Sequence, residues 1–423
     1  MIKRLKNNLL ARNTFSTFIG MGSRIGIQAV YFIIIARSLG NEGYGAFIGT
    51  VSLVALLAPF ASLGSGNLLV KNVSRNPDLF SVYWGNALIL TIVSGSCLVA
   101  LVAGLSFWLL PESVSLGLVI LVAVSDILFA RIHDICGQAY QAFQRLGRTA
   151  GFQVLFSGSR MLSAAFLLLA VDQPKPADWG WFYLGSTAVA CLIAVWLVCR
   201  ELGRPAPEPR RIPEEIREGM YFSISLSSQN IYNDLDKTLL ARLASLETAG
   251  IYAAGYRIID VAFTPVRSML YAAYARFFQH GASGIQGSLR FAKKLLPLAG
   301  GYGLVVGVLL WITAPVVPMM LGEEYASSVE VIRCLSVIPL LRAVHYFAAD
   351  SLTGSGHQGV RSAVQVAVTV VSVLVNVWLI PRYGWKGAAI ALIGTDLLLA
   401  AGLWGAVALI RSGKKKQKLT QVA

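Results

Sequence analysis

Charged side chains occur at helical spacing inside long apolar stretches of this 423-residue chain. Between positions 249 and 277, Arg257, Asp260 and Arg267 are three and seven residues apart, which places them on one side of a helix. Guanidinium groups stay charged in apolar surroundings and bind phosphate or carboxylate oxygens bidentately. Because a charge inside a membrane is costly, such a residue usually faces a water-filled cavity or a partner, and each is a candidate binding residue.

Five apolar segments carry a narrow polar stripe of this kind, and the stripes predict a shared, water-filled cationic cavity. In chain order their residues are Thr17, Gly20, Arg24, Gln28 and Tyr31; Arg131, Asp134, Gln138, Gln141 and Arg145; Ser223, Ser227, Asn230, Asp234 and Lys237; Arg257, Asp260, Thr264, Arg267 and Tyr271; and Arg342, His345 and Tyr346. The residues expected to bind an anionic cargo are Arg24, Arg131, Lys237, Arg257, Arg267 and Arg342.

The acidic residues and one histidine leave two interpretations open. Three pairs have the three-residue spacing that also suits a structural ion pair: Arg131–Asp134, Asp234–Lys237 and Arg257–Asp260. Asp126 and Asp396 are isolated acids on their predicted helices, either coupling-ion sites or helix–helix contacts. His345 is either a hydrogen-bonded interior residue or a proton carrier.

Membrane-spanning helices are needed to position these residues. The chain is 56% hydrophobic and 13% charged, against about 25% charged residues in soluble domains, which excludes an ordinary soluble enzyme and a disordered chain. We predict an all-α integral membrane protein with twelve segments near the ~20 residues that a bilayer requires. The segments are 15–37, 46–70, 83–109, 114–138, 152–171, 179–198, 219–243, 249–277, 295–320, 331–352, 360–380 and 386–410.

The distribution of Lys and Arg predicts the orientation of these segments. With the N-terminus inside, the inside segments carry 23 Lys and Arg residues and the outside segments carry six. Positive residues accumulate on the cytoplasmic side of membrane proteins. This bias favours twelve crossings with both termini in the cytoplasm.

A charged, proline-rich linker divides the predicted helices into two groups of six. It spans residues 200–217, between an N-terminal lobe (1–199) and a C-terminal lobe (218–423) that ends in a basic cytoplasmic tail. The sequences that begin at Ile35 and at Leu240 share a series of similar residues, and the two members of each pair are 205 positions apart. Because each half has an even number of helices, we predict parallel lobes around a central cavity.

Several function classes are excluded by what the sequence lacks. Gly354 and Gly359 have the separation of a phosphate-binding loop, but Val360 and Arg361 follow where lysine and serine or threonine are needed. The five cysteines show no metal-ligand spacing, and the basic residues belong to no nucleic-acid recognition motif. We therefore expect no nucleotide, metal, other cofactor or nucleic acid. The predicted outside loops are also too short to house an external active site.

The first predicted outside loop, Ala36-Arg37-Ser38-Leu39-Gly40-Asn41-Glu42-Gly43-Tyr44-Gly45-Ala46-Phe47, resembles that of bacterial polysaccharide flippases. The residues Asp236-Lys237, Ala249-Gly250-Ile251-Tyr252 and Ala254-Gly255-Tyr256-Arg257 are similar as well. These proteins form the O-antigen-type branch of the multidrug/oligosaccharidyl-lipid/polysaccharide exporter superfamily. The resemblance covers nearly the whole chain.

The resemblance implies a V-shaped pair of lobes in the bacterial cytoplasmic (inner) membrane. It implies transport and no enzyme activity: the cargo is undecaprenyl-pyrophosphate-linked oligosaccharide, such as an O-antigen unit for lipopolysaccharide, flipped by alternating access. Expected partners are the bilayer, the lipid-linked substrate, and polysaccharide polymerase and chain-length proteins. The assignment of the individual cavity residues follows from the polar stripes and not from the resemblance.

Two other functions stay open at this point. One is a small-molecule or drug antiporter with the same lobes, although an arginine-rich cavity disfavours cationic drugs. The other is a scaffold of a polysaccharide assembly complex that transports nothing itself. A glycosyltransferase is disfavoured because of the short outside loops.

Overall fold

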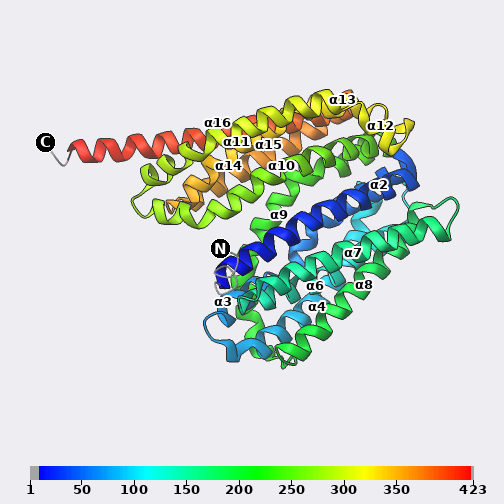
Figure 1. Cartoon of the computed structure of the whole chain (residues 1–423), viewed down its shortest axis with the longest axis horizontal. Coiled ribbons are helices and arrows are strands. Elements are labelled where there is room, and N and C mark those ends of the chain that lie inside the picture. Colours follow the sequence, from blue (N-terminus) through cyan, green and yellow to red (C-terminus); the bar gives the residue numbers. More distant parts are fainter. Residues whose placement is uncertain (1–8, 421–423) are drawn as a thin grey trace. The chain divides into compact units, whose positions relative to one another are not determined.

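The computed structural model is built from helices (Figure 1). It describes the backbone of residues 9–420 and the side chains of residues 26–412, apart from positions 221, 222, 225, 228, 229, 271, 272 and 275. The chain divides into two compact units, Met1–Arg242 and Leu243–Ala423. This division falls in the last turn of the helix that follows the proline-rich linker, so a boundary at the linker itself stays a prediction.

The N-terminal unit contains α2 (Leu9–Leu57), η1 (Ala58–Phe60), α3 (Ser65–Val73), η2 (Pro77–Leu79), α4 (Phe80–Leu109), α5 (Leu116–Ala123), η3 (Val124–Phe129), α6 (Ala130–Ala142), α7 (Leu146–Ala170), α8 (Pro176–Glu201), η4 (Pro209–Arg211) and α9 (Ile212–Leu243). The C-terminal unit contains α10 (Leu246–Gly281), α11 (Ile285–Thr313), α12 (Val316–Leu321), η5 (Glu323–Tyr325), α13 (Ser328–Leu335), α14 (Ile338–Gly354), α15 (Gln358–Tyr383) and α16 (Trp385–Thr420).

Every predicted membrane segment coincides with helical structure, and the protein is an all-α, multi-span membrane protein. Among the described residues, eight helices are long and apolar enough to cross a membrane, or nine if the bent pair that ends in α14 forms one span. The helices α9 and α10 are longer than these criteria require but fall outside the count, because their polar residues lower their hydropathy. Twelve crossings therefore remain a prediction.

Glycine permits the sharp turn between the first two predicted segments. The helical run α2 is interrupted at Gly40, where φ is 69° and ψ is 176°. Only glycine adopts this backbone conformation readily, because a Cβ atom would clash with the adjacent peptide groups. The predicted outside loop is thus a tight break between two helical segments.

The second predicted segment is itself broken at Pro59. The helix passes into the 3-10 turn η1, and the chain then takes left-handed conformations at Leu63 (φ 46°) and Gly64 (φ 71°) before α3 begins. Proline has no N–H group and therefore cannot continue the helical hydrogen-bond ladder. A broken helix at membrane depth leaves carbonyl groups that neighbouring side chains must satisfy.

Each unit has its own aromatic core, and its outer surface is apolar. Trp84, Tyr140 and Phe152 are buried in the N-terminal unit, and Phe263 and Phe347 are buried in the C-terminal unit. Large apolar side chains are exposed on the outer faces of helices of both units, such as those of Trp108, Leu169, Trp311 and Leu374. Such exposure suits contact with lipid and not with water.

The linker is docked against the N-terminal unit. The side chain of Asn86 on α4 accepts a hydrogen bond from the backbone N–H of Glu208 at 2.8 Å and donates to Glu215 Oε1, also at 2.8 Å. The backbone N–H of Ala206 donates to the carbonyl of Ser81 at 2.9 Å. Glu215, in the first turn of α9 before the predicted span, is buried, and this burial raises its pKa.

Candidate functional site

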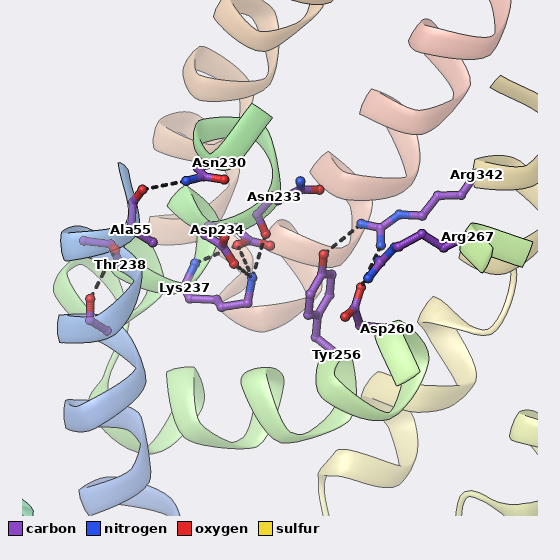
Figure 2. A network of polar contacts seen from close by, with 12 residues as sticks. Ala55, Asn230, Asn233, Asp234, Lys237, Thr238, Tyr256, Asp260, Arg267 and Arg342 are labelled. Carbon is purple, nitrogen blue, oxygen red and sulfur yellow. Dashed lines mark hydrogen bonds and ion pairs between the residues drawn. The ribbon is translucent and has the colours of Figure 1, made fainter. Parts of the chain in front are cut away.

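Three charged residues predicted from the stripes meet in the C-terminal unit, where α10 packs against α14. Arg267 Nη2 donates to Asp260 Oδ1 at 2.7 Å, one side of the cluster in Figure 2. Arg342 Nη1 lies 3.6 Å from the same carboxylate oxygen. Arg342 Nη2 also donates to the hydroxyl of Tyr256 at 2.8 Å. One carboxylate therefore holds two guanidinium groups.

The second side of this cluster is buried against α16. Asp396 is fully buried, and its oxygens lie 3.6 Å from Arg342 Nε and 3.3 Å from His345 Nε2. Neither oxygen makes a hydrogen bond within the described part of the chain. The His345 ring stacks on Tyr346 with a centroid distance of 4.7 Å. Asp396 is thus a counter-charge to Arg342 inside the packed helices.

The two arginines of the cluster differ in their access to solvent. The Arg342 side chain is 2% exposed, whereas the Arg267 side chain is 51% exposed. The Arg267 guanidinium also lies 5.8 Å from the centroid of the Phe263 ring. The buried guanidinium serves the internal structure, and the exposed one keeps N–H groups available to an anion. Arg257, one turn before Asp260, is partly buried.

In the N-terminal unit, Asp126 is paired with an arginine that the stripes did not include. Arg160 Nη2 on α7 donates to Asp126 Oδ1 at 2.7 Å, and the hydroxyl of Tyr183 donates to the other carboxylate oxygen at 2.8 Å. The guanidinium carbon of Arg160 lies 3.9 Å from the ring centroid of Tyr183 and 4.3 Å from that of Phe156. Asp126 therefore forms a helix–helix contact, which is one of its two predicted roles.

The sequence did contain a signal for Arg160. It is the one charged residue in the predicted segment 152–171, and a lone charge in an apolar helix needs a partner on a neighbouring helix. Asp126 lies in η3, a π-helical turn inside the fourth predicted segment. π-turns change the direction of side chains and occur frequently at functional sites. Helical spacing relates residues on one helix only, so it does not reveal a pair formed across two helices.

Lys237 is buried in α9 among oxygen atoms. Its Nζ donates to the carbonyl of Asn233 at 2.7 Å, to Asp234 Oδ1 at 3.0 Å and to Asp236 Oδ1 at 3.4 Å (Figure 2). The predicted pair of Asp234 and Lys237 is present, with Asp236 as a second acid. This arrangement neutralises the lysine locally.

The other polar residues of the α9 stripe contact the broken second segment. Asn230 Nδ2 donates to the carbonyl of Ala55 at 2.8 Å (Figure 2). Ala55 lies four residues before Pro59, so its carbonyl has lost the N–H that a regular helix supplies. Ser227 and Ser223 donate in the same way to the carbonyls of Leu56 and Pro59. This part of the stripe therefore satisfies carbonyl groups that the helix break leaves without a backbone N–H.

Two of the predicted anion-binding residues remain, Arg131 and Arg24. Arg131 Nη1 lies 3.5 Å from Asp134 Oδ2, as the structural-pair interpretation predicts. Arg24 lies outside the residues whose side chains are described. Within the described residues, no group of three His, Cys, Asp or Glu side chains is placed to hold a metal ion.

Solved structures of membrane transporters share this fold. An inward-facing multidrug resistance MATE family transporter of the MOP superfamily superposes with a TM-score of 0.74 at 16% identity, over 94% of this chain and 99% of the other. The lipid II flippase MurJ superposes with a TM-score of 0.70 at 11% identity, over 94% of this chain and 87% of the other. This chain therefore has the fold of these two proteins.

Sequence comparison then defines the family. The pattern of the polysaccharide biosynthesis protein family matches residues 10–279. A protein of Escherichia coli K12 designated an O-antigen transporter is 20% identical over 404 residues, which cover 93% of this chain and 95% of that protein. The match covers more than half of the chain, so the chain belongs to the polysaccharide biosynthesis protein family.

Proposed function

We propose that this protein flips undecaprenyl-pyrophosphate-linked oligosaccharide, such as an O-antigen or related repeat unit, across the bacterial cytoplasmic membrane. The family and the O-antigen designation of the E. coli relative support a lipid-linked glycan as cargo. The lipid II flippase has the same fold, and its name also describes the flipping of a lipid.

The half-exposed guanidinium of Arg267 is the observation that carries the proposal. It lies on a helix that we predict to cross the membrane, and the bond to Asp260 uses only one of its nitrogens. The remaining N–H groups are free to bind two oxygens of a pyrophosphate. Asp260 also faces Arg342, so a bound anion does not leave that carboxylate without a positive neighbour.

The topology that goes with this function is part of the proposal. Twelve helices cross the membrane, both termini lie in the cytoplasm, and two six-helix halves alternate access to a cationic cavity. The lipid tail stays in the bilayer while the head group crosses. The acids Asp234, Asp260, Asp126 and Asp396 and the histidine His345 are candidate coupling or ion-pair residues.

Reconstitution of the purified protein in liposomes tests the proposal. Liposomes carry a fluorescent undecaprenyl-pyrophosphate oligosaccharide, and an added quencher reports how much label reaches the opposite leaflet. We compare the wild type with Arg267→Ala and with a matched control, Arg276→Ala, which removes an exposed arginine from the same helix. We expect about a 10- to 150-fold loss for Arg267→Ala, because a charge-assisted hydrogen bond is worth about 1.5–3 kcal/mol, and little change for the control.

Each other outcome contradicts a specific part of the proposal. Translocation that survives in Arg267→Ala would place the anion site elsewhere. No translocation by the wild type under any imposed ion gradient would favour the drug antiporter or the scaffold. Export of a cationic dye by the same liposomes would identify the antiporter.

A further inference from the structure

A cavity of about 250 Å³ lies within the N-terminal unit, at the break in the second predicted segment. Pro59 and Gly64 line it from the break, α6 and α7 supply most of the rest, and Ser223 and Leu226 line it from α9. The helices α3, α6 and α7 that surround it are labelled in Figure 1. In transporters, interrupted membrane helices are where substrates bind, because the irregular backbone lines a cavity and not lipid.

Four carboxamide side chains line this cavity without a protein partner. They belong to Asn67, Gln138, Gln141 and Gln153. None of these side chains makes a hydrogen bond to any residue that the structure describes. Each carboxamide offers two donors and an acceptor, so together they present many hydrogen-bonding groups to whatever occupies the cavity.

The cavity carries no net charge at neutral pH. Its one arginine, Arg131, lies 3.5 Å from its one acid, Asp134, and the other titratable group is His133. The cavity is therefore uncharged overall, whereas the exposed side chain of Arg267 carries a positive charge. The ring of Phe152 adds an apolar surface beside the carboxamides. Carboxamides together with an aromatic face match the hydroxyl groups and C–H faces of a neutral sugar better than they match a phosphate.

The volume limits the size of the ligand. Pockets for drug-sized molecules measure about 300–1,000 Å³, and this cavity lies just below that range. It therefore suits one sugar ring and not a whole repeat unit. Gly66 sets one wall, because a Cβ atom there would lie 1.7 Å from Gln138 Oε1.

We propose that this cavity binds one neutral sugar ring of the transported glycan through Asn67, Gln138 and Gln153, separately from the pyrophosphate. The inference rests on the proposed flippase function and adds a site that recognises one sugar of the cargo. A lipid-linked glycan is then recognised at two places, its phosphates by arginine and one sugar by carboxamides.

Saturation-transfer NMR on the full-length protein in lipid nanodiscs tests the sugar site directly. The probes are a panel of methyl glycosides, including methyl N-acetylglucosaminide, and inorganic phosphate as a charged alternative. We expect saturation of the ring protons of at least one glycoside in the wild type. Gln138→Leu and Gln153→Leu should each weaken that glycoside's binding about three- to tenfold, the effect of losing one or two neutral hydrogen bonds.

Two further variants keep the test decisive. Gln365→Leu makes the same chemical change on α15 at a residue that does not line the cavity, and it should leave glycoside binding unchanged. Gly66→Ala keeps every polar group but forces the Gln138 amide to move, and it should also weaken binding. It therefore reports on the site even if a leucine variant misfolds.

The result separates this inference from the flippase proposal. If the wild type translocates lipid-linked glycan but the cavity variants bind glycosides normally, the sugar site is wrong and the flippase stands. Glycoside binding that requires Gln138, in a protein that translocates nothing, would refute the flippase and leave a sugar-binding cavity. Binding of phosphate in place of all glycosides would overturn the inference.

Discussion

Replacing Asp126 by alanine should strongly destabilise the N-terminal unit. The substitution leaves the guanidinium of Arg160 without its counter-charge and the hydroxyl of Tyr183 without its acceptor. The Arg160 and Asp126 side chains are only 17% and 18% exposed, so water cannot replace the lost partner easily. Removing one member of a buried ion pair costs about 3–5 kcal/mol.

The rings around Arg160 moderate this loss. Contacts of its guanidinium with Phe156 and Tyr183 remain in the variant, and each cation–π contact is worth about 0.5–2 kcal/mol. We therefore expect about 3 kcal/mol for Asp126→Ala and about the same for Arg160→Met. In the double variant no buried charge is left unpaired. Its loss should fall short of the sum of the single losses by about 2–3 kcal/mol.

The measurement is unfolding of the purified protein by SDS in mixed micelles, followed by tryptophan fluorescence. The ring centroids of Trp179 and Tyr183 are 5.7 Å apart, so the fluorescence of Trp179 reports on this region. The matched control is Asp172→Ala, which removes an exposed acid from the loop between α7 and α8. Single losses below about 1 kcal/mol, or losses that simply add, would refute the view that Asp126 and Arg160 stabilise the unit as a pair. A stable double variant that no longer transports would instead assign the pair to ion coupling.

Two further predictions concern the linker and the C-terminal packing. Burial raises the pKa of Glu215, so the folded state favours the neutral carboxylic acid. The resulting contribution to stability is fully present below the unfolded pKa of about 4.3. It is lost as the pH rises through the folded pKa. Glu215→Gln should therefore raise the melting temperature at pH 8 and change it little at pH 4, whereas Glu214→Gln, at an exposed position, should change neither. A Cβ atom on Gly354 would lie 2.5 Å from the carbonyl oxygen of Phe277, so Gly354→Ala should cost about 1–3 kcal/mol in SDS unfolding. Gly359→Ala, which meets open space, is its control, and equal losses would contradict the packing argument.

The positions of the helices could be predicted from the sequence because apolar length determines where a membrane helix forms. All twelve predicted segments are helical, and Pro59 interrupts its segment as its missing N–H requires. Composition alone does not determine the number of crossings, because α9 and α10 are long but polar. Polar helices in a membrane depend on neighbours that cover them, and one segment alone does not reveal its neighbours.

The cationic cavity could be predicted only in part, because helical spacing identifies one side of a helix but not the group that faces it. Arg267 and Arg342 look alike in the sequence, yet one is half exposed and the other is enclosed between two carboxylates. Asn230 lies on the same kind of stripe and completes a broken helix instead. The difference lies in the partner: a polar residue is available to a ligand only when no neighbouring helix already satisfies it. By that criterion Arg267 and the unpaired carboxamides around Gln138 are the positions where variants should separate transport from stability.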